Sequence, residues 1–560
     1  MEGHIEVYGN VQGLDRLQKR RLLNLGRKKI EADAVIPFDR ARNMMEVSKE
    51  IARQVGLIIN RRGVVEHVVV GTRERIGLPE LSSERVGRAR FRGLRFVHTH
   101  LNGELLSKED LTDLAILQLD LVACILERKG EPGELIQIGH LMPGGGKGQA
   151  WDFIGPVPVG ELDLDFTGFI AELEAEFVKE RGTHYVTGAG AREACVLVVV
   201  ALPRKAKNME ERVAEMKDLS YSAGLSVLDV VLQRPKELHP RFLVGKGKIE
   251  EIAIGCSQAG AEMLVFDEEL TPGQLNSISS LTGLKVIDRN QLILDIFAAR
   301  AKTSEAKLQV ELAQLRYILP RVAERGTALS RLTGGIGGRG PGETKLEVNR
   351  ARIRERIAFL ERKLEEVGKA RERKRERRRR AGIPVVSIIG YTNSGKSTLL
   401  NLLTKSAVEV EERFFSTLTP TTRLIKYPAR KGIVLTDTVG FIEDLPEVLM
   451  RAFAATLEEL EDATLLLHLV DISSPDFEER IDAVNGVIEK LGLAEKPRLL
   501  VFNKIDLVDR GFVRLTEGRY GASSISCVTQ EGIEGLVRTI EAAVEKAEGS
   551  AKSLAVESTF

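Results

Sequence analysis

The chain is poor in cysteine and in aromatic residues, and it has no long uninterrupted apolar run. Its four cysteines, Cys124, Cys195, Cys256 and Cys527, are scattered and form no CxxC pair. This scattering argues against a disulfide framework and against a zinc ribbon, and it fits a reducing cytosol. The sequence also lacks a signal-peptide pattern and a stretch of membrane-spanning length. We therefore expect a cytoplasmic protein without integral membrane association.

An excess of charge of one sign is also lacking. The 82 Lys and Arg residues are balanced by 81 Asp and Glu residues, for a formal net charge of +1. No global charge therefore argues for nucleic acid, and we expect no DNA partner; an RNA partner has to be argued from local charge. The 560 residues with 43% hydrophobic content are enough for several cores, so several domains are predicted.

The most informative run extends from Gly390 to Ser397 and fits the pattern GxxxxGK[ST]. A buried strand is predicted just before it, at 385–389, and a helix is expected to open at Thr398. In this setting backbone N–H groups surround the phosphates, Lys396 places a cation on the β and γ phosphates, and the Ser397 hydroxyl can ligate Mg²⁺. The alternative is an ordinary Gly-rich turn, which would not require a strand before it and a helix after it. The predicted phosphate-binding residues are Gly390, Asn393, Ser394, Gly395, Lys396, Ser397 and Thr398.

A second motif, DxxG, follows about forty residues later at the end of another apolar strand. Asp437 is predicted to reach Mg²⁺ through water, and the Gly440 amide to contact the γ-phosphate. The next residue is Phe441, where Ras-like enzymes commonly use a glutamine to orient the attacking water. Because an apolar side chain cannot do this, we expect slow hydrolysis that accelerates when a partner orders the switch loops, unless another polar residue makes the water contact. No catalytic residue is assigned.

A third motif, NKxD, specifies the base. Asn503, Lys504 and Asp506 end a third strand, and the Asp506 carboxylate can accept hydrogen bonds from guanine N1 and N2. Such a site rejects an analogue without these donors by roughly 10⁴-fold or more, because its own polar groups are then left unpaired. Ser526 and Cys527 follow a further predicted strand and are placed where a loop would close over guanine, with Cys527 where alanine is usual. We therefore predict GTP and GDP as ligands, rather than adenine nucleotides.

The segment between the first two motifs is rich in hydroxyl groups and is typical of a switch loop. Thr417 is the predicted second hydroxyl ligand of Mg²⁺, and Thr419, Thr421 and Thr422 are the alternatives. A surface loop that happens to contain several threonines would look the same.

Two long helical patterns lie between residues 303 and 380, joined by a glycine-rich loop that is either a ligand contact or a flexible linker. Apolar residues recur in each at alternating spacings of four and three, which predicts an antiparallel helical hairpin. From Lys369 to Arg380 there are nine Lys or Arg and two Glu. This basic end suits contact with the RNA backbone, although a solvated helix face is the usual alternative. The two stripes are Leu308, Leu312, Leu315, Leu319 and Val322, and Ile353, Ile357, Leu360, Leu364 and Val367.

Residues 195–300 alternate apolar strands with amphipathic helical stretches, a pattern that predicts a small parallel α/β domain. The run from Gly245 to Lys248 could contact phosphate, or it could be an ordinary turn.

From about residue 195 to 545 the chain resembles the HflX-type GTPases. The most specific stretches are 295–300 (DIFAAR), 307–315 (KLQVELAQL), 337–344 (GGRGPGET) and 437–446 (DTVGFIEDLP). The resemblance implies binding to the large ribosomal subunit and its rRNA, stimulation of GTP hydrolysis by that subunit, and a role in splitting or rescuing stalled ribosomes. The residues alone leave a second hypothesis open, a GTP-dependent signalling or scaffolding switch that does not act on ribosomes.

The region before about residue 190 is additional to that resemblance. His98-Thr-His100 followed by Ser107 and Asp110 looks like the JAMM metallopeptidase signature, in which two histidines and an aspartate hold Zn²⁺. Six residues separate His100 from Ser107 where that family normally has seven, and Glu50 is only a distant candidate for the catalytic base. A third hypothesis is therefore a GTPase fused to a JAMM-like domain, which we expect to be inactive as a peptidase.

The predicted architecture is α/β and multidomain, and we expect a monomer. The GTPase domain should be a P-loop domain, with a mostly parallel mixed sheet covered by helices on both faces. The predicted parts are an N-terminal α/β extension at 1–190, a small parallel α/β domain at 191–302, the helical hairpin at 303–382, the GTPase domain at 383–548 and a C-terminal tail at 549–560.

Overall fold

The computed structural model of the chain divides into two compact units. One comprises Met1–Met209 and Leu225–Ile287, the other Glu210–Gly224 and Asp288–Phe560. In the described residues, no helix is long and apolar enough to cross a membrane. The described residues are 6–79, 81, 91–127, 134–143, 150–181, 193–201, 209–333, 341–380, 382–404, 421–424, 432–437 and 460–557.

The N-terminal region folds around a seven-stranded sheet of order β1-β3-β2-β4-β5-β6-β7. Its middle strand, β4, is buried along its whole length and runs parallel to β5 but antiparallel to β2. Helices and sheet share one hydrophobic core, so the predicted α/β character of this region is confirmed. The strands are β1 (Glu6–Gly9), β2 (Val55–Asn60), β3 (Val65–Val70), β4 (Leu94–His100), β5 (Leu121–Glu127), β6 (Glu134–Leu141) and β7 (Trp151–Pro158). The helices are α1 (Arg16–Arg27), α2 (Phe38–Ile51), α3 (Lys108–Ile116), the 3₁₀ turn η1 (Val159–Glu161) and α4 (Phe166–Arg181).

A second sheet has four strands in the order β11-β10-β8-β9. Its central strand β8 is parallel to both β9 and β10, as the alternation of strands and helices predicts. Gly245, at a φ of 90°, precedes α6, and the two lysines that follow pair with Glu250 and Glu251 on the same helix. The Gly/Lys run is therefore the start of a helix. The elements are β8 (Glu193–Val200), α5 (Met209–Ser222), β9 (Leu225–Gln233), α6 (Lys246–Ala259), β10 (Met263–Phe266), α7 (Pro272–Thr282) and β11 (Lys285–Asp288).

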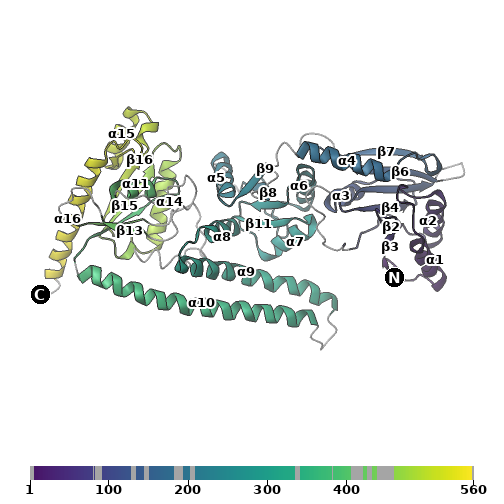
Figure 1. Ribbon diagram of the computed structural model, residues 1–560, viewed down its shortest axis with the longest axis horizontal. Coiled ribbons are helices and arrows are strands. Elements are labelled where there is room, and N and C mark those ends of the chain that lie inside the picture. Colours follow the sequence, from purple (N-terminus) through teal and green to yellow (C-terminus); the bar gives the residue numbers. More distant parts are fainter. Residues whose placement is uncertain are drawn as a thin grey trace. The chain divides into compact units, whose positions relative to one another are not determined.

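The predicted helical hairpin is confirmed. After α8 (Arg289–Arg300), the two long helices α9 (Ser304–Thr333) and α10 (Pro341–Arg380) run side by side (Figure 1). Arg316 pairs with Glu361 at 2.7 Å, whereas Glu305, earlier in α9, pairs with Arg371, later in α10, at 3.0 Å. This reversed order shows that the helices are antiparallel. At 40 residues, α10 is about 60 Å long.

The third sheet has six strands in the order β13-β14-β12-β15-β16-β17, with β13 antiparallel and the neighbours from β14 to β17 parallel. It is the mostly parallel mixed sheet that the sequence predicts for a P-loop domain. The strands are β12 (Val385–Ile389), β13 (Thr421–Leu424), β14 (Val434–Asp437), β15 (Leu465–Asp471), β16 (Arg498–Asn503) and β17 (Ser523–Ser524). The helices are α11 (Lys396–Thr404), α14 (Phe477–Lys490), the 3₁₀ turn η3 (Ile505–Leu507), α15 (Arg510–Tyr520) and α16 (Ile533–Glu557).

Candidate functional site

The phosphate-binding run connects β12 to α11, and α11 begins at Lys396, two residues before the predicted start at Thr398. Two glycines of the run have little room for a side chain. A Cβ on Gly390, whose φ is 152°, would lie 2.2 Å from the carbonyl oxygen of Leu469. A Cβ on Gly395, whose φ is 94°, would lie 2.3 Å from Asn503 Nδ2. The loop can therefore adopt this close, phosphate-cradling path only with glycine at both positions.

Lys396 is buried at the start of α11, where its ammonium group donates to the carbonyl oxygen of Tyr391 over 2.6 Å. Burial lowers the pKa of Lys396 to about 8, and the charge of Asp437 opposes this shift only in part. An anionic ligand beside this buried ammonium group would stabilise its charged form and would itself be bound more tightly.

Ser397 and Asp437 lie together although they belong to different motifs. The Ser397 hydroxyl is 3.0 Å from Asp437 Oδ2, because α11 follows β12 and Asp437 ends the adjacent parallel strand β14. Both side chains are buried. A hydroxyl and a carboxylate brought together in this way are oxygen donors of the kind Mg²⁺ takes, so the residues present fit that ion.

On the base side, Asn503 joins two loops. Its Nδ2 donates to the carbonyl oxygen of Ser394 over 2.8 Å, and its Oδ1 accepts from the N–H of Cys527 over 3.1 Å. Ser526 is buried and accepts from the N–H of Thr529 over 3.1 Å, which shapes the same loop. The sequence motif gives Asn503 as a nucleotide residue, and the structure adds that it fixes one loop against the other.

Lys504 and Asp506 complete the base motif. Lys504 has a φ of 66°, in the left-handed region, and its Nζ lies 2.6 Å from Asp471 Oδ2. Asp506 is exposed in η3, where a base could reach it. Sequence reasoning missed Asp471, whose signal is an aspartate at the carboxyl end of the apolar strand β15.

Four of the predicted residues, Thr417, Thr419, Gly440 and Phe441, lie outside the described residues. The alternatives Thr421 and Thr422 lie on β13, opposite Asp437 and Thr436. The choice among the switch threonines therefore stays a prediction.

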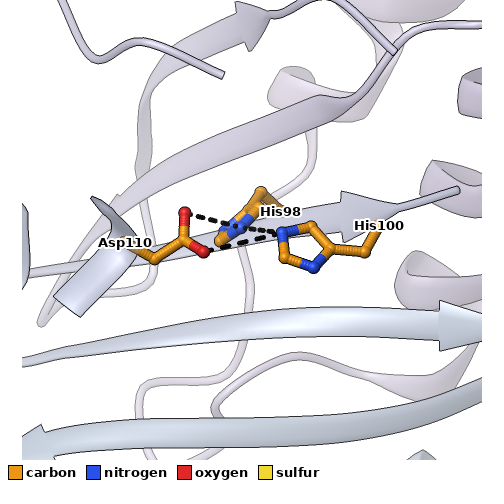
Figure 2. Close-up of side chains that lie close together, drawn as sticks. All are labelled: His98, His100 and Asp110. Carbon is orange, nitrogen blue, oxygen red and sulfur yellow. Dashed lines mark hydrogen bonds and ion pairs between the residues drawn. The ribbon is translucent and has the colours of Figure 1, made fainter. Parts of the chain in front are cut away.

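The N-terminal region brings together the three residues predicted to bind Zn²⁺. One nitrogen of His98, one of His100 and one carboxylate oxygen of Asp110 all lie within 4.8 Å of one another (Figure 2). Glu50, which the sequence offers only as a distant candidate for a catalytic base, forms an ion pair with Arg21. Sequence reasoning missed Asp113, one turn beyond Asp110 on α3, whose pKa is raised to about 6 by burial and then by the charge of Asp110.

Three family models match consecutive parts of the chain. They are described as the GTP-binding GTPase N-terminal region, over residues 210–298, the GTP-binding GTPase middle region, over 300–378, and a 50S ribosome-binding GTPase, over 385–504.

Whole proteins that are similar to this chain point to the same family. GTPase HflX of Caldanaerobacter subterraneus subsp. tengcongensis is 46% identical over 351 residues, which are 62% of this chain and 80% of that protein. GTPase HflX of Escherichia coli (strain K12) is 47% identical over 319 residues, 57% of this chain and 74% of that protein. A GTP-binding protein from the archaeon Sulfolobus solfataricus, solved with GDP, is 26% identical with a TM-score of 0.35, covering 63% of this chain and 99% of that chain. With its nucleotide motifs assembled on a P-loop sheet and relatives this similar, the chain is a GTPase and belongs to the HflX family.

Proposed function

We propose that this GTPase uses Mg²⁺ and acts on the large ribosomal subunit, splitting or rescuing stalled ribosomes in the cytoplasm. The ion would be held by Ser397 directly and by Asp437 through water, with Thr417 as the further hydroxyl. When bound, Mg²⁺ neutralises charge that develops on the β and γ phosphates. Lys396 adds a fixed positive charge to the same phosphates, and Asp506 selects guanine.

The observation that carries the ribosomal proposal is the charge at the end of α10. The run from Lys369 to Arg380 contains nine Lys or Arg and two Glu and lies on one continuous helix. Clustered positive charge on a long helix attracts phosphate and releases counterions when it binds. The description of the matching family model as a 50S ribosome-binding GTPase supports the large subunit as the source of that phosphate.

Part of this charge is already paired within the protein. Arg371 pairs with Glu305 at 3.0 Å, Arg375 approaches Asp462 at 3.5 Å, and Lys369 pairs with Glu365 at 2.8 Å. Arg373 and Arg377 are exposed. We therefore assign the RNA contacts first to Arg373 and Arg377.

The test is GTP hydrolysis by the purified protein, alone and with large ribosomal subunits, at two salt concentrations. Given that Phe441 replaces the usual glutamine, hydrolysis alone should be slow, on the order of 10⁻³ s⁻¹ or below, and the subunit should raise it strongly at low salt. The double substitution Arg373→Ala with Arg377→Ala should weaken binding to the subunit and reduce the slope of log K against log[salt] by about two.

Lys490 and Arg514 provide a matched control, since they are exposed on α14 and α15 of the GTPase domain and belong to no basic run. Replacing both with alanine removes the same charge and should leave the stimulation unchanged. Hydrolysis that does not respond to the subunit at either salt concentration would contradict the ribosomal proposal and favour a GTP-dependent switch acting elsewhere.

A further inference from the structure

The N-terminal region contains a compact group of metal-binding side chains that GTP hydrolysis does not use. His98 and His100 are two residues apart on β4, so both point to the same face of the sheet, and Asp110 faces them from the first turn of α3 (Figure 2). His98 is fully buried, and His100 and Asp110 are 4% and 8% exposed. Three donors from two elements therefore meet in one buried place.

The hydrogen bonds around His100 fix which of its nitrogens can bind a metal ion. Its Nδ1 lies 2.7 Å from the carbonyl oxygen of Glu104. Because a carbonyl oxygen can only accept, Nδ1 carries the hydrogen, and Nε2 of the neutral ring presents its lone pair to the cluster. Orientation of a ligand histidine by a backbone carbonyl is the usual arrangement in metal sites.

Asp110 is oriented in a similar way. Its Oδ2 accepts from both the N–H and the hydroxyl of Ser107, over 2.8 and 2.7 Å, because Ser107 caps α3. These bonds turn Oδ1 toward His98 Nε2, which is 3.3 Å away. One carboxylate oxygen is thus used for support, and the other is presented to the cluster.

The distances fit a tetrahedral ion. Zn²⁺ bonds of about 2.0–2.1 Å at tetrahedral angles place neighbouring ligand atoms about 3.3 Å apart. His98 Nε2 lies 2.9 Å from His100 Nε2 and 3.3 Å from Asp110 Oδ1, and His100 Nε2 lies 3.7 Å from Asp110 Oδ2. The two separations that involve His98 are thus within a few tenths of an ångström of this value, while the 3.7 Å contact of His100 is with Oδ2, the oxygen that Ser107 supports.

A hydrogen-bonded cluster without an ion is the alternative. In such a cluster of neutral rings, the two Nε2 atoms, 2.9 Å apart, have one hydrogen between them. Asp110 Oδ1 can accept only that same hydrogen from the rings, so one of the three atoms is left without a hydrogen bond from the other two. The other ring nitrogen of His98 is buried without a hydrogen-bond partner among the described residues, and this holds with or without an ion on Nε2. A cation would satisfy all three acceptor atoms together.

We propose that His98 Nε2, His100 Nε2 and Asp110 Oδ1 bind one Zn²⁺ ion, with water or another ligand in the fourth position. Two imidazoles and one carboxylate form a three-ligand set of the kind found in open zinc sites. The ion ties β4 to α3. Because α3 in turn packs against α6, whose Ile254 belongs to the same hydrophobic core as α3, the ion also stabilises that packing.

The test uses the full chain, stripped with a chelator and then dialysed against Zn²⁺. We expect about one equivalent of zinc that resists dialysis, a cobalt derivative with the visible spectrum of four-coordinate Co²⁺, and slower hydrogen exchange in α3 and α6 when zinc is bound. Asp110→Asn, which keeps an acceptor for Ser107, and His100→Gln should each lower zinc affinity about 100-fold or more, since losing a ligand costs at least as much as losing its support.

His67→Gln is the matched control, a histidine on β3 of the same sheet, separated from β4 by β2, that lies outside the cluster. It should bind zinc as the unchanged protein does. GTP hydrolysis should be the same in Asp110→Asn as in the unchanged protein. A failure of the zinc proposal can therefore be told apart from a failure of the ribosomal proposal. Zinc that is absent from the unchanged protein, or retained equally by Asp110→Asn and His100→Gln, would overturn the proposal.

Discussion

The side-chain amide of Asn503 donates to the carbonyl oxygen of Ser394 over 2.8 Å and so joins the base-recognition motif to the phosphate-binding loop. The other end of the amide accepts from the N–H of Cys527. Both partners are backbone groups, and Asn503 is buried with them. One side chain therefore fixes the predicted phosphate-binding loop against the predicted base-binding loop.

Replacing Asn503 with alanine should therefore weaken nucleotide binding through the loss of the link between the two loops. Two hydrogen bonds disappear, and a buried carbonyl and a buried N–H lose their partner, at about 1–3 kcal/mol for each unsatisfied group. We expect the Kd for GDP to rise roughly 10-fold or more, measured with a fluorescent GDP analogue. Asn485→Ala is the control, because Asn485 accepts from Arg498 on the exposed surface. Equal affinity in the Asn503 and Asn485 variants would show that the link between the loops is unimportant.

The base preference can be moved by one substitution. In Asp506→Asn the carboxylate becomes an amide, which can donate to the C2 carbonyl of xanthine but no longer accepts both guanine donors. Asp506 is exposed in η3, so the change should not disturb the core. We expect the ratio of GTP to XTP affinity to fall by on the order of 100-fold or more in a competition assay. An unchanged ratio would mean that the base is read by another group.

The elements of the GTPase domain and the hairpin were predictable because their signals are local. The strand at Val385–Ile389 has the predicted bounds, and the periodic stripes lie on α9 and α10. A pattern of apolar residues and a motif that must follow a strand are enough for such predictions.

What the sequence did not reveal depends on contacts between distant segments. The ion pair of Lys504 with Asp471 joins the ends of two strands, and the bonds of Asn503 depend on which loops the sheet order brings together. The grouping of His98 with His100 was predictable, because residues two apart on a strand share a face. The support from Glu104 was not, since it depends on the path of the loop between β4 and α3.

Binding of nucleotide should take up a proton at alkaline pH. The pKa of Lys396 is lowered to about 8 by burial, so above pH 8 this side chain is largely neutral in the free protein. Phosphates beside it favour the charged form and raise its pKa, so GDP binding draws in a proton. We expect affinity to fall up to about 10-fold from pH 8 to pH 9, and calorimetry at pH 8.5 in buffers of different ionisation enthalpy to show net uptake.

The uptake should vanish at pH 6.5, where Lys396 is charged both free and bound. Lys490→Met, which changes an exposed lysine of α14, should keep the uptake at pH 8.5, whereas Lys396→Met should lose it along with much of the affinity. A wild-type protein with no proton uptake at pH 8.5 would show that Lys396 is already fully charged before nucleotide binds.

The GTPase domain should lose stability in mild acid through His468. This side chain is buried in β15, and burial, with the charges of Arg498 and Lys396, lowers its pKa to about 3. In the unfolded chain the pKa is about 6.5, so below that pH the unfolded state binds a proton that the folded state does not. The stabilisation is thus complete above pH 6.5 and declines as the pH falls toward 3. Between pH 7 and pH 5 the free energy of unfolding should drop by about 2 kcal/mol from this group.

The measurement is hydrogen exchange in β12 and β15 at the two pH values, corrected for the intrinsic exchange rate. Because other groups also titrate, the informative quantity is the change of the pH effect in His468→Leu. This apolar side chain can occupy the buried position and cannot take up a proton, so about 2 kcal/mol of the pH effect should disappear. His140→Leu, in the N-terminal sheet, should leave the effect in β12 and β15 as it is. If His468→Leu retained the full loss of stability at pH 5, the acid sensitivity of the domain would have to come from other side chains.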